Sequence, residues 1–267
     1  MLNELVSKRA LKKHIEQLIG KEGVRKALKD PHTRRKPRPC GFTIHTGIGC
    51  SLKCIYCYIE DMGFQWSIRE YPLTGLELVY SLLSNPYFVP GERGSLLAIG
   101  SVTEPFHGVT RRKTMEYIES IYTYLGNPTQ FSTKMYITER EAYELARISK
   151  SRISPLVTII TIKWAPKLEP LVPPPDKRFE TIRNLRRAGL KPFLFLRPVI
   201  PGIIEDEYVE ILENAHKYGA EGVVIGSLRV TKTIIERLAK IGVPVEEIMY
   251  RLPRKPRGNE QISIDTR

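Results

Sequence analysis

Cysteine and long apolar runs are both scarce in this sequence. Only four of the 267 residues are cysteine, and three of those four lie within eight residues of one another. A disulfide framework is therefore excluded, and the pattern is typical of metal or cluster ligands in a reducing cytoplasm. No apolar run approaches the roughly 18 residues that a membrane helix needs. The N-terminus has no apolar signal core, so we expect neither membrane insertion nor secretion.

Acidic residues are outnumbered by basic ones. The chain has 42 Lys and Arg residues against 29 Asp and Glu residues, which gives a formal net charge of +13. Such a balance favours polyanionic partners, of which nucleic acid is the usual one. A basic surface with ion-pair networks and no polyanionic partner is the alternative interpretation. Charge alone does not decide between the two.

Three regions follow from the pattern along the chain. Residues 1–39 predict a helical, basic extension that ends in a proline-rich segment over residues 30–39. That segment should be extended and exposed, either as a phosphate-binding arm or as a solvated linker. Residues 40–250 predict the main domain. Residues 251–267 are polar and basic without periodicity, so we expect weak order there, or contact only with a partner.

The main domain alternates apolar strands with helical segments. The predicted strands cover residues 41–46, 95–101, 130–135, 156–162, 191–198 and 222–226, and a capping box of Thr138 and Glu141 opens one of the intervening helices. Near-continuous apolar strands separated by helices indicate a parallel sheet that is buried on both faces. The fold class is therefore α/β, and functional residues are expected at the carboxyl ends of the strands.

The most informative stretch is residues 49–58, Gly-Cys-Ser-Leu-Lys-Cys-Ile-Tyr-Cys-Tyr, with three cysteines in a C-x3-C-x2-C spacing. A structural zinc site takes four ligands, and here the fourth would be Cys40 or His45. A cubane iron-sulfur cluster normally takes four cysteines, so three would leave one iron open to a non-protein ligand. We expect Cys40 itself to be a small buried residue at the entrance of the first strand.

This spacing, with Tyr56 directly before the last cysteine, resembles the radical S-adenosylmethionine enzymes. Four further segments, residues 101–106, 169–170, 175–180 and 197–202, are similar to the spore photoproduct lyase-like branch of that family. The resemblance covers about residues 40 to 230. It implies a partial (β/α)6 TIM-like barrel and an enzyme that works with an external electron donor.

The resemblance also implies the cofactors. Cys50, Cys54 and Cys57 would bind three irons of a [4Fe-4S] cluster, and the fourth iron would chelate the amino and carboxylate groups of S-adenosylmethionine. An electron from the cluster would cleave the cofactor to a 5′-deoxyadenosyl radical, which abstracts a hydrogen atom from the substrate.

Further residues are expected to contact the cofactor. Thr103 and Glu104, at the end of the second strand, can reach its methionine part, because an ammonium needs a hydroxyl or carboxylate acceptor. Lys134 and Thr161 end the next two strands and match positions of polar cofactor contacts in the family. Three more predicted contacts are the ring of Tyr56 on adenine, the backbone around Tyr58, and Arg197 with the cofactor carboxylate or a substrate phosphate.

Three other side chains carry expectations of their own. Glu169 and Arg178 are expected to form an ion pair, in preference to contacting substrate. Ser101 stands where spore photoproduct lyase has the cysteine that donates a hydrogen atom to its substrate radical, and a serine O–H bond is too strong for that role. Repair of thymine lesions by that mechanism is therefore not expected. His107 is a candidate acid, base or ligand.

We expect a nucleic acid or nucleotide-containing substrate, on the basis of the net charge and the basic arms of the chain. A duplex substrate would need the target base flipped out of its stack. Two alternatives stay open: the same radical chemistry on a protein, peptide or small molecule, and a non-catalytic nucleic-acid-binding module that contains zinc or a cluster.

Overall fold

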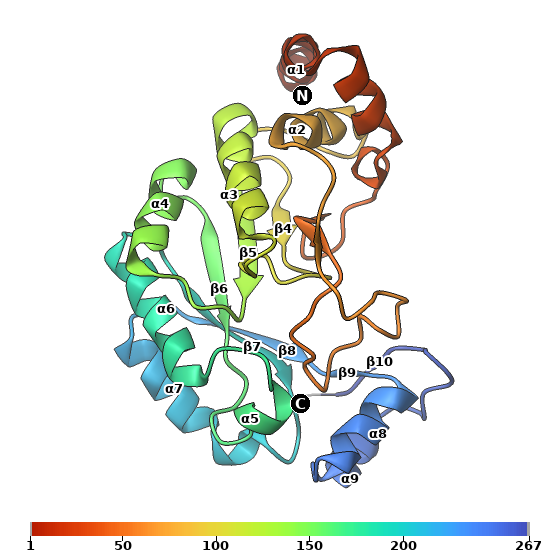
Figure 1. Ribbon diagram of the computed structural model, residues 1–267, viewed down its shortest axis with the longest axis vertical. Helices are drawn as coiled ribbons and strands as arrows, with labels where there is room; N and C mark the ends of the chain where they lie inside the picture. The colour runs from red at the N-terminus through yellow and green to blue at the C-terminus, as the bar shows by residue number, and fades with distance from the viewer. Residues whose placement is uncertain (1, 266–267) are drawn as a thin grey trace.

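A curved, six-stranded parallel sheet forms the centre of the molecule in the computed structural model, which describes residues 2–265 (Figure 1). Its spatial order follows the chain, and every neighbouring pair is parallel. The strands are β1 (Phe42–Ile44), β4 (Leu97–Ile99), β5 (Thr129–Thr133), β6 (Ser154–Thr158), β7 (Phe193–Val199) and β8 (Val223–Ser227). All six predicted strands are present, and most are shorter than the apolar runs that predicted them.

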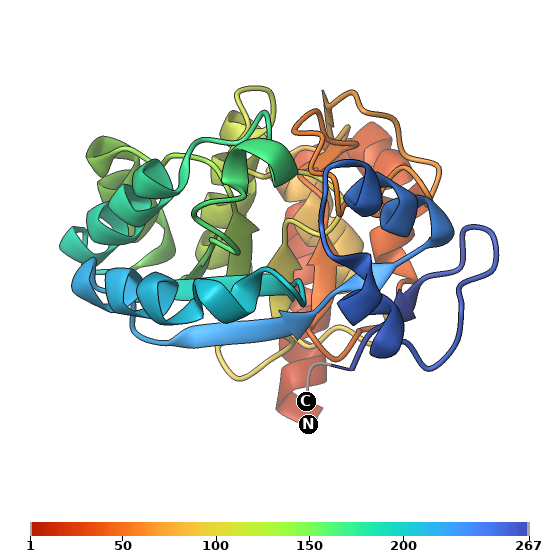
Figure 2. The ribbon, with the colours of Figure 1, turned by 90° about the horizontal axis from the view of Figure 1, so that it is seen from below.

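Helices cover the convex face of this sheet, which leaves a half-barrel with an open concave side (Figure 2). They are α2 (Gly75–Ser84), α3 (Arg111–Ser120), α4 (Glu139–Ser149), α6 (Pro175–Arg187) and α7 (Tyr208–Lys217). α3 continues into a π-helical turn over Ile121–Leu125. The predicted capping box of Thr138 and Glu141 is confirmed at the start of α4. The α/β partial barrel expected from the sequence is thus confirmed.

A short antiparallel pair closes the loop that holds the three cysteines. β2 (Gly47–Ile48) pairs with β3 (Arg69–Glu70), so residues 49–68 begin and end at the same place. Gly49 has φ of 78°, and a Cβ atom there would lie 2.0 Å from the carbonyl oxygen of Ser67. Only glycine fits that approach. We call residues 49–68 the cysteine loop.

The N-terminal region packs on the barrel as α1 (Leu2–Lys29), bent at Gly20, followed by a 3-10 turn over Pro31–Thr33. The expectation of an extended, exposed segment is wrong at its start. Asp30 is buried and accepts hydrogen bonds from the Tyr71 hydroxyl at 2.7 Å and from His32 Nδ1 at 2.6 Å. A carboxylate that caps the turn and binds two aromatic donors holds the segment against β3.

Cys40 and the C-terminal tail also differ from expectation. Cys40 is exposed, because it lies in a tight turn closed by two hydrogen bonds between the backbones of Arg38 and Gly41. The tail is ordered as far as it is described: β10 (Ile262–Ser263) pairs with β9 (Arg229–Val230), and Ile262 and Ile264 are buried. The alternation Ile-Ser-Ile is a short strand pattern.

Two further helices near the C-terminus, α8 (Lys232–Lys240) and α9 (Val245–Tyr250), form a second, smaller apolar core. This core also contains Leu52, Cys54 and Tyr56 of the cysteine loop. The loop is therefore packed between the barrel and the C-terminal helices. Within residues 2–265, no helix combines the length and apolar character that crossing a bilayer requires.

Acid should weaken the fold through His45. Burial, and then the positive charge of Arg35 and of His32, lowers the pKa of His45 to about 3. Arg35 Nη1 lies 2.8 Å from His45 Nε2, which must therefore accept the hydrogen bond. Because the unfolded chain takes up this proton first, stability should fall between pH 6.5 and about 3, by up to about 1.4 kcal/mol per pH unit from this group.

The measurement is urea unfolding of the wild type and of His45→Gln at several pH values between 7 and 4. The glutamine variant keeps an acceptor for Arg35 and removes the titration, so its stability should fall less steeply. Equal slopes for the two proteins would contradict the assignment.

Candidate functional site

A cavity of about 170 Å³ lies at the carboxyl ends of the parallel strands, beneath the cysteine loop. The cysteine loop contributes residues 50–59, except for 51, 53 and 55. The remaining lining comes from residues 100–104 after β4, 132–134 at the end of β5, Thr158 of β6, three residues of β7, and residues 227–229. Five consecutive strands thus deliver side chains to one space.

All three cysteines of the motif line this cavity. Cys54 is the most buried, and burial raises the pKa of all three thiols. Thiolates in such surroundings need a compensating cation, which a bound metal supplies. No group of three or more His, Cys, Asp or Glu side chains within residues 2–265 is arranged to hold a metal ion as it stands.

The two candidate fourth ligands for zinc lie elsewhere. His45 contacts Arg35, and Cys40 is exposed in its turn. Neither residue lines the cavity that contains the three thiols. The arrangement therefore offers three cysteines to a bound group and leaves any fourth position to a ligand from outside the protein.

One side of the cysteine loop is held by a buried ion pair. Tyr56 donates a short hydrogen bond to Glu169, whose other oxygen lies 2.6 Å from Arg178 Nη1. Arg178 also donates to the carbonyl of Thr158 at 3.0 Å. Just before Glu169, the short helix α5 (Ala165–Leu168) ends at a carbonyl that accepts from Ile55 N at 2.9 Å. The predicted ion pair is confirmed, and it fixes the loop to β6 and α6.

α8 holds the other side of the loop. Arg237 Nη2 donates to the carbonyl of Cys57 at 3.0 Å and lies 3.7 Å from Asp61. Thr231, which caps α8, donates to the same aspartate at 2.7 Å. Nothing in the sequence around the cysteines pointed to this contact, because the two segments are 180 positions apart.

Glu104 is buried between the ends of β4 and β5. It accepts hydrogen bonds from the Thr133 hydroxyl at 2.5 Å and from the backbone N–H groups of Lys134 at 2.9 Å and Phe106 at 3.0 Å. Burial raises its pKa. Its neighbour Thr103 has a buried hydroxyl without a hydrogen-bond partner among the described residues. Both residues line the cavity.

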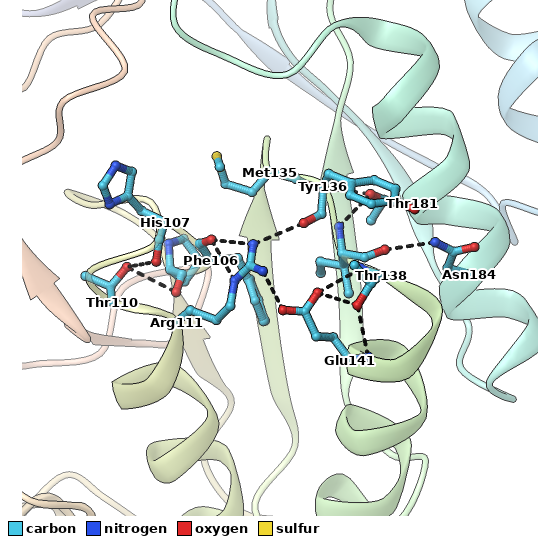
Figure 3. Close-up of polar contacts among 12 residues, drawn as sticks. Phe106, His107, Thr110, Arg111, Met135, Tyr136, Thr138, Glu141, Thr181 and Asn184 are labelled. Carbon is cyan, nitrogen blue, oxygen red and sulfur yellow. Dashed lines mark hydrogen bonds and ion pairs between the residues drawn. The ribbon is translucent and has the colours of Figure 1, made fainter.

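The loops after β4 and β5 are tied together by side chains that do not line the cavity (Figure 3). Arg111 donates to the carbonyls of Phe106 at 2.9 Å and Tyr136 at 3.1 Å, and it forms a short ion pair with Glu141. Glu141 is also part of the capping box with Thr138. This network fixes the backbone that carries Glu104 and Lys134.

Lys134 is half-buried and lies with its ammonium 5.7 Å from the centre of the Tyr56 ring. Burial alone would lower its pKa, but nearby acidic groups, first Cys54 and then Glu169 and Glu104, outweigh burial and raise it. The site therefore keeps a permanent positive charge next to the thiols.

The structure separates Thr161 from the other predicted site residues. Thr161 does not line the cavity, and its hydroxyl donates to the buried Glu207 at 2.8 Å. β6 ends at Thr158, three residues earlier than the apolar run suggests, and Thr158 occupies the lining position. Tyr58, Ser101 and Arg197 do line the cavity, and His107 lies outside it with Nε2 3.2 Å from Ser51 Oγ.

Three comparisons place the chain among known proteins. No family model matches the sequence. An uncharacterized protein of Methanocaldococcus jannaschii is 22% identical over 172 residues, which cover 63% of this chain and 64% of that protein. An uncharacterized protein of Acidianus two-tailed virus is 22% identical over 191 residues, covering 66% of this chain and 62% of that protein. The chain thus spans less than two thirds of the length of the curated relatives it matches.

Solved structures are more informative. A spore photoproduct lyase variant with bound S-adenosylmethionine and dinucleoside spore photoproduct superposes with a TM-score of 0.69 and 15% identity, covering 90% of this chain and 73% of that one. This chain has the fold of spore photoproduct lyase. Streptococcus suis SuiB bound to S-adenosylmethionine follows with a TM-score of 0.50 and 13% identity, over 79% of this chain and 48% of SuiB. Both are radical S-adenosylmethionine enzymes, so the predicted resemblance is confirmed at the level of the fold.

Removing the charge of Glu169 should cost about 3–5 kcal/mol of unfolding free energy, because Arg178 is then buried without its partner. We expect this loss in urea unfolding of Glu169→Gln. The double variant Glu169→Gln, Arg178→Met should recover part of it, because no unpaired buried charge remains.

Glu180→Gln is the matched control, since Glu180 pairs with the exposed Lys177 on the same helix. Exposed pairs contribute at most about 1 kcal/mol, so its effect should be small. Equal losses in Glu169→Gln and Glu180→Gln would show that the buried pair has no special role.

Proposed function

We propose that this chain is a radical S-adenosylmethionine enzyme in which Cys50, Cys54 and Cys57 bind a [4Fe-4S] cluster. The observation that carries the proposal is the position of the three thiols, which line one cavity at the strand ends of a spore photoproduct lyase fold. The cluster, when bound, would supply the electron for reductive cleavage of S-adenosylmethionine. A reducing cytoplasm and an external electron donor suit that chemistry.

The chain's own residues would bind and orient the cofactor. The Thr103 hydroxyl is buried and unpartnered, so it can accept from the cofactor's ammonium group or donate to its carboxylate. The fixed ammonium of Lys134 would attract the carboxylate. Glu104 would act on the cofactor mainly by holding the loops that carry these two groups. Thr161 would instead hold the backbone after β6, since its hydroxyl donates to Glu207.

Aromatic and cationic groups would enclose the rest of the cofactor. The ring of Tyr56 is fixed by its bond to Glu169 and supports Lys134, so adenine would stack beside both. The backbone around Tyr58 would bind the adenine edge. Arg197 lines the same cavity on the β7 side, within reach of a cofactor or substrate anion.

The substrate we propose is a nucleic acid or a nucleotide-containing molecule, in line with the charge of +13. Ser101 is exposed and lines the cavity at the position expected for a hydrogen-donating cysteine. The described cavity has no thiol besides the three proposed ligands, so a substrate radical formed there would take its hydrogen atom from another source.

The proposal is tested without oxygen. Reconstituted protein is reduced with dithionite and given S-adenosylmethionine, and 5′-deoxyadenosine is quantified with and without RNA and DNA. The wild type should bind about four irons per chain and form 5′-deoxyadenosine, at a rate that one polymer raises. Cys54→Ala should lose both iron and product, because one iron loses its ligand.

Cys40→Ala is the matched control, because that cysteine is exposed and lies outside the cavity. It should keep the iron content and the product yield of the wild type. Full cluster binding by Cys54→Ala would overturn the ligand assignment. A protein with a full cluster that neither binds nor cleaves S-adenosylmethionine would favour the binding-module alternative.

A further inference from the structure

Two arginines line the cavity without a carboxylate partner. Arg197 lies near the end of β7, and Arg229 begins β9 directly after β8. β7 and β8 lie at the opposite edge of the six-stranded sheet from β1, which leads into the cysteine loop, and β9 pairs with β10 in a separate sheet. The only carboxylate in the lining, Glu104, is held by three donors from the β4 and β5 loops. The β7–β9 side of the cavity is therefore cationic.

Two neighbouring arginines do have acidic partners. Arg178 is paired with Glu169, and Arg237 is paired with Glu60 and Asp61. Among the residues described, neither Arg197 nor Arg229 takes part in an ion pair, and the guanidinium carbon of Arg197 lies 5.9 Å from the centre of the Phe195 ring. Arg178 and Arg237 thus hold the cysteine loop through acidic partners, whereas Arg197 and Arg229 present guanidinium groups to the cavity without one among the described residues.

The position of the Arg197 side chain depends on a glycine in the neighbouring strand. Gly226 of β8 lies under its side chain: a Cβ atom on residue 226 would be 2.5 Å from Arg197 Cδ and 2.8 Å from Cγ. Gly226 does not have a positive φ, so its backbone does not require glycine. The absence of a side chain there makes a slot for the arginine stem, with the ring of Phe195 as its other wall.

We propose that Arg197 and Arg229 together bind a phosphate group of the substrate; this inference rests on the proposed function. The guanidinium fork matches the oxygens of phosphate and binds it through charge-assisted hydrogen bonds. Two guanidinium groups balance the two negative charges of a terminal phosphate monoester, such as that of a mononucleotide or a phosphorylated strand end, whereas an internucleotide phosphodiester or a carboxylate carries only one. The thiol side of the cavity would then hold the cofactor, and the arginine side would orient the substrate.

Binding of inorganic phosphate to the full chain tests the proposal directly, by phosphorus NMR titration at constant ionic strength, with acetate as the carboxylate probe. Arg197→Gln and Arg229→Gln should each weaken phosphate binding about tenfold or more, since each removes a charged donor. Arg187→Gln is the control: it makes the same charge change at an exposed site on α6 and should leave phosphate binding unchanged.

The variant Gly226→Ala tests the position of the Arg197 side chain separately from its charge. It leaves every charge in place, yet its methyl group must displace the Arg197 stem, so phosphate binding should weaken several-fold. Equal weakening by Arg187→Gln, or tighter binding of acetate than of phosphate, would overturn the proposal.

The affinity for S-adenosylmethionine is measured in parallel on reconstituted protein. If Arg197→Gln and Arg229→Gln lose cofactor affinity but keep phosphate binding, the arginines bind the cofactor, and this inference fails while the proposed function stands. If the wild type binds phosphate through both arginines but binds no S-adenosylmethionine, the phosphate site stands and the proposed function fails.

Discussion

The buried contact of Tyr56, Glu169 and Arg178 is the constraint on which the site depends. Arg178 has no exposed surface, and within the described part of the chain its charge is compensated by Glu169 and by the carbonyl of Thr158. Breaking such a pair costs more than the pair contributes, so the three residues stay together or the region loosens as a unit. Because Tyr56 lies between Cys54 and Cys57, this contact also sets where two of the thiols point. The packing of α6 and the geometry of the cysteine loop therefore depend on the same buried contact.

The cysteine loop is held from three directions by segments that are distant in sequence. Its two ends meet the N-terminal region, where Tyr71 binds Asp30 and His45 binds Arg35. Its middle meets α5 and Glu169, and its far side meets Arg237 of α8. A ten-residue motif has few contacts of its own, and ionising three buried thiols for a metal is unfavourable until the cation is in place. The surrounding elements offset that cost by fixing the loop before anything binds.

The sequence predicted the parts that depend on short-range pattern. Six apolar runs became six parallel strands, the spacing of Thr138 and Glu141 became a helix cap, and the clustered cysteines came to one cavity. Parts that depend on tertiary contact were missed: Cys40 is exposed by a two-bond turn, and Ile262 is buried by pairing with β9. Thr161 was expected at the end of its strand, but β6 ends at Thr158, because the length of an apolar run does not fix where a strand ends. Glu207 gave no signal, since the groups that donate hydrogen bonds to its carboxylate are brought to it only by the fold.

The charges around the cavity divide it into two sides with different chemistry. On the β4–β5 side, Lys134 lies beside the three thiols, and Glu104 accepts three hydrogen bonds from the protein, so the sulfur atoms are the groups there that can bind a metal. On the β7–β9 side, Arg197 and Arg229 have no acidic partner among the described residues. Thiols that ionise only beside a cation at one end of the cavity, and guanidinium groups at the other end, favour a metal group and an anion, respectively. A cationic metal group at the thiols and an anionic substrate group at the arginines would satisfy both ends at once, and the reacting atoms would then lie between them.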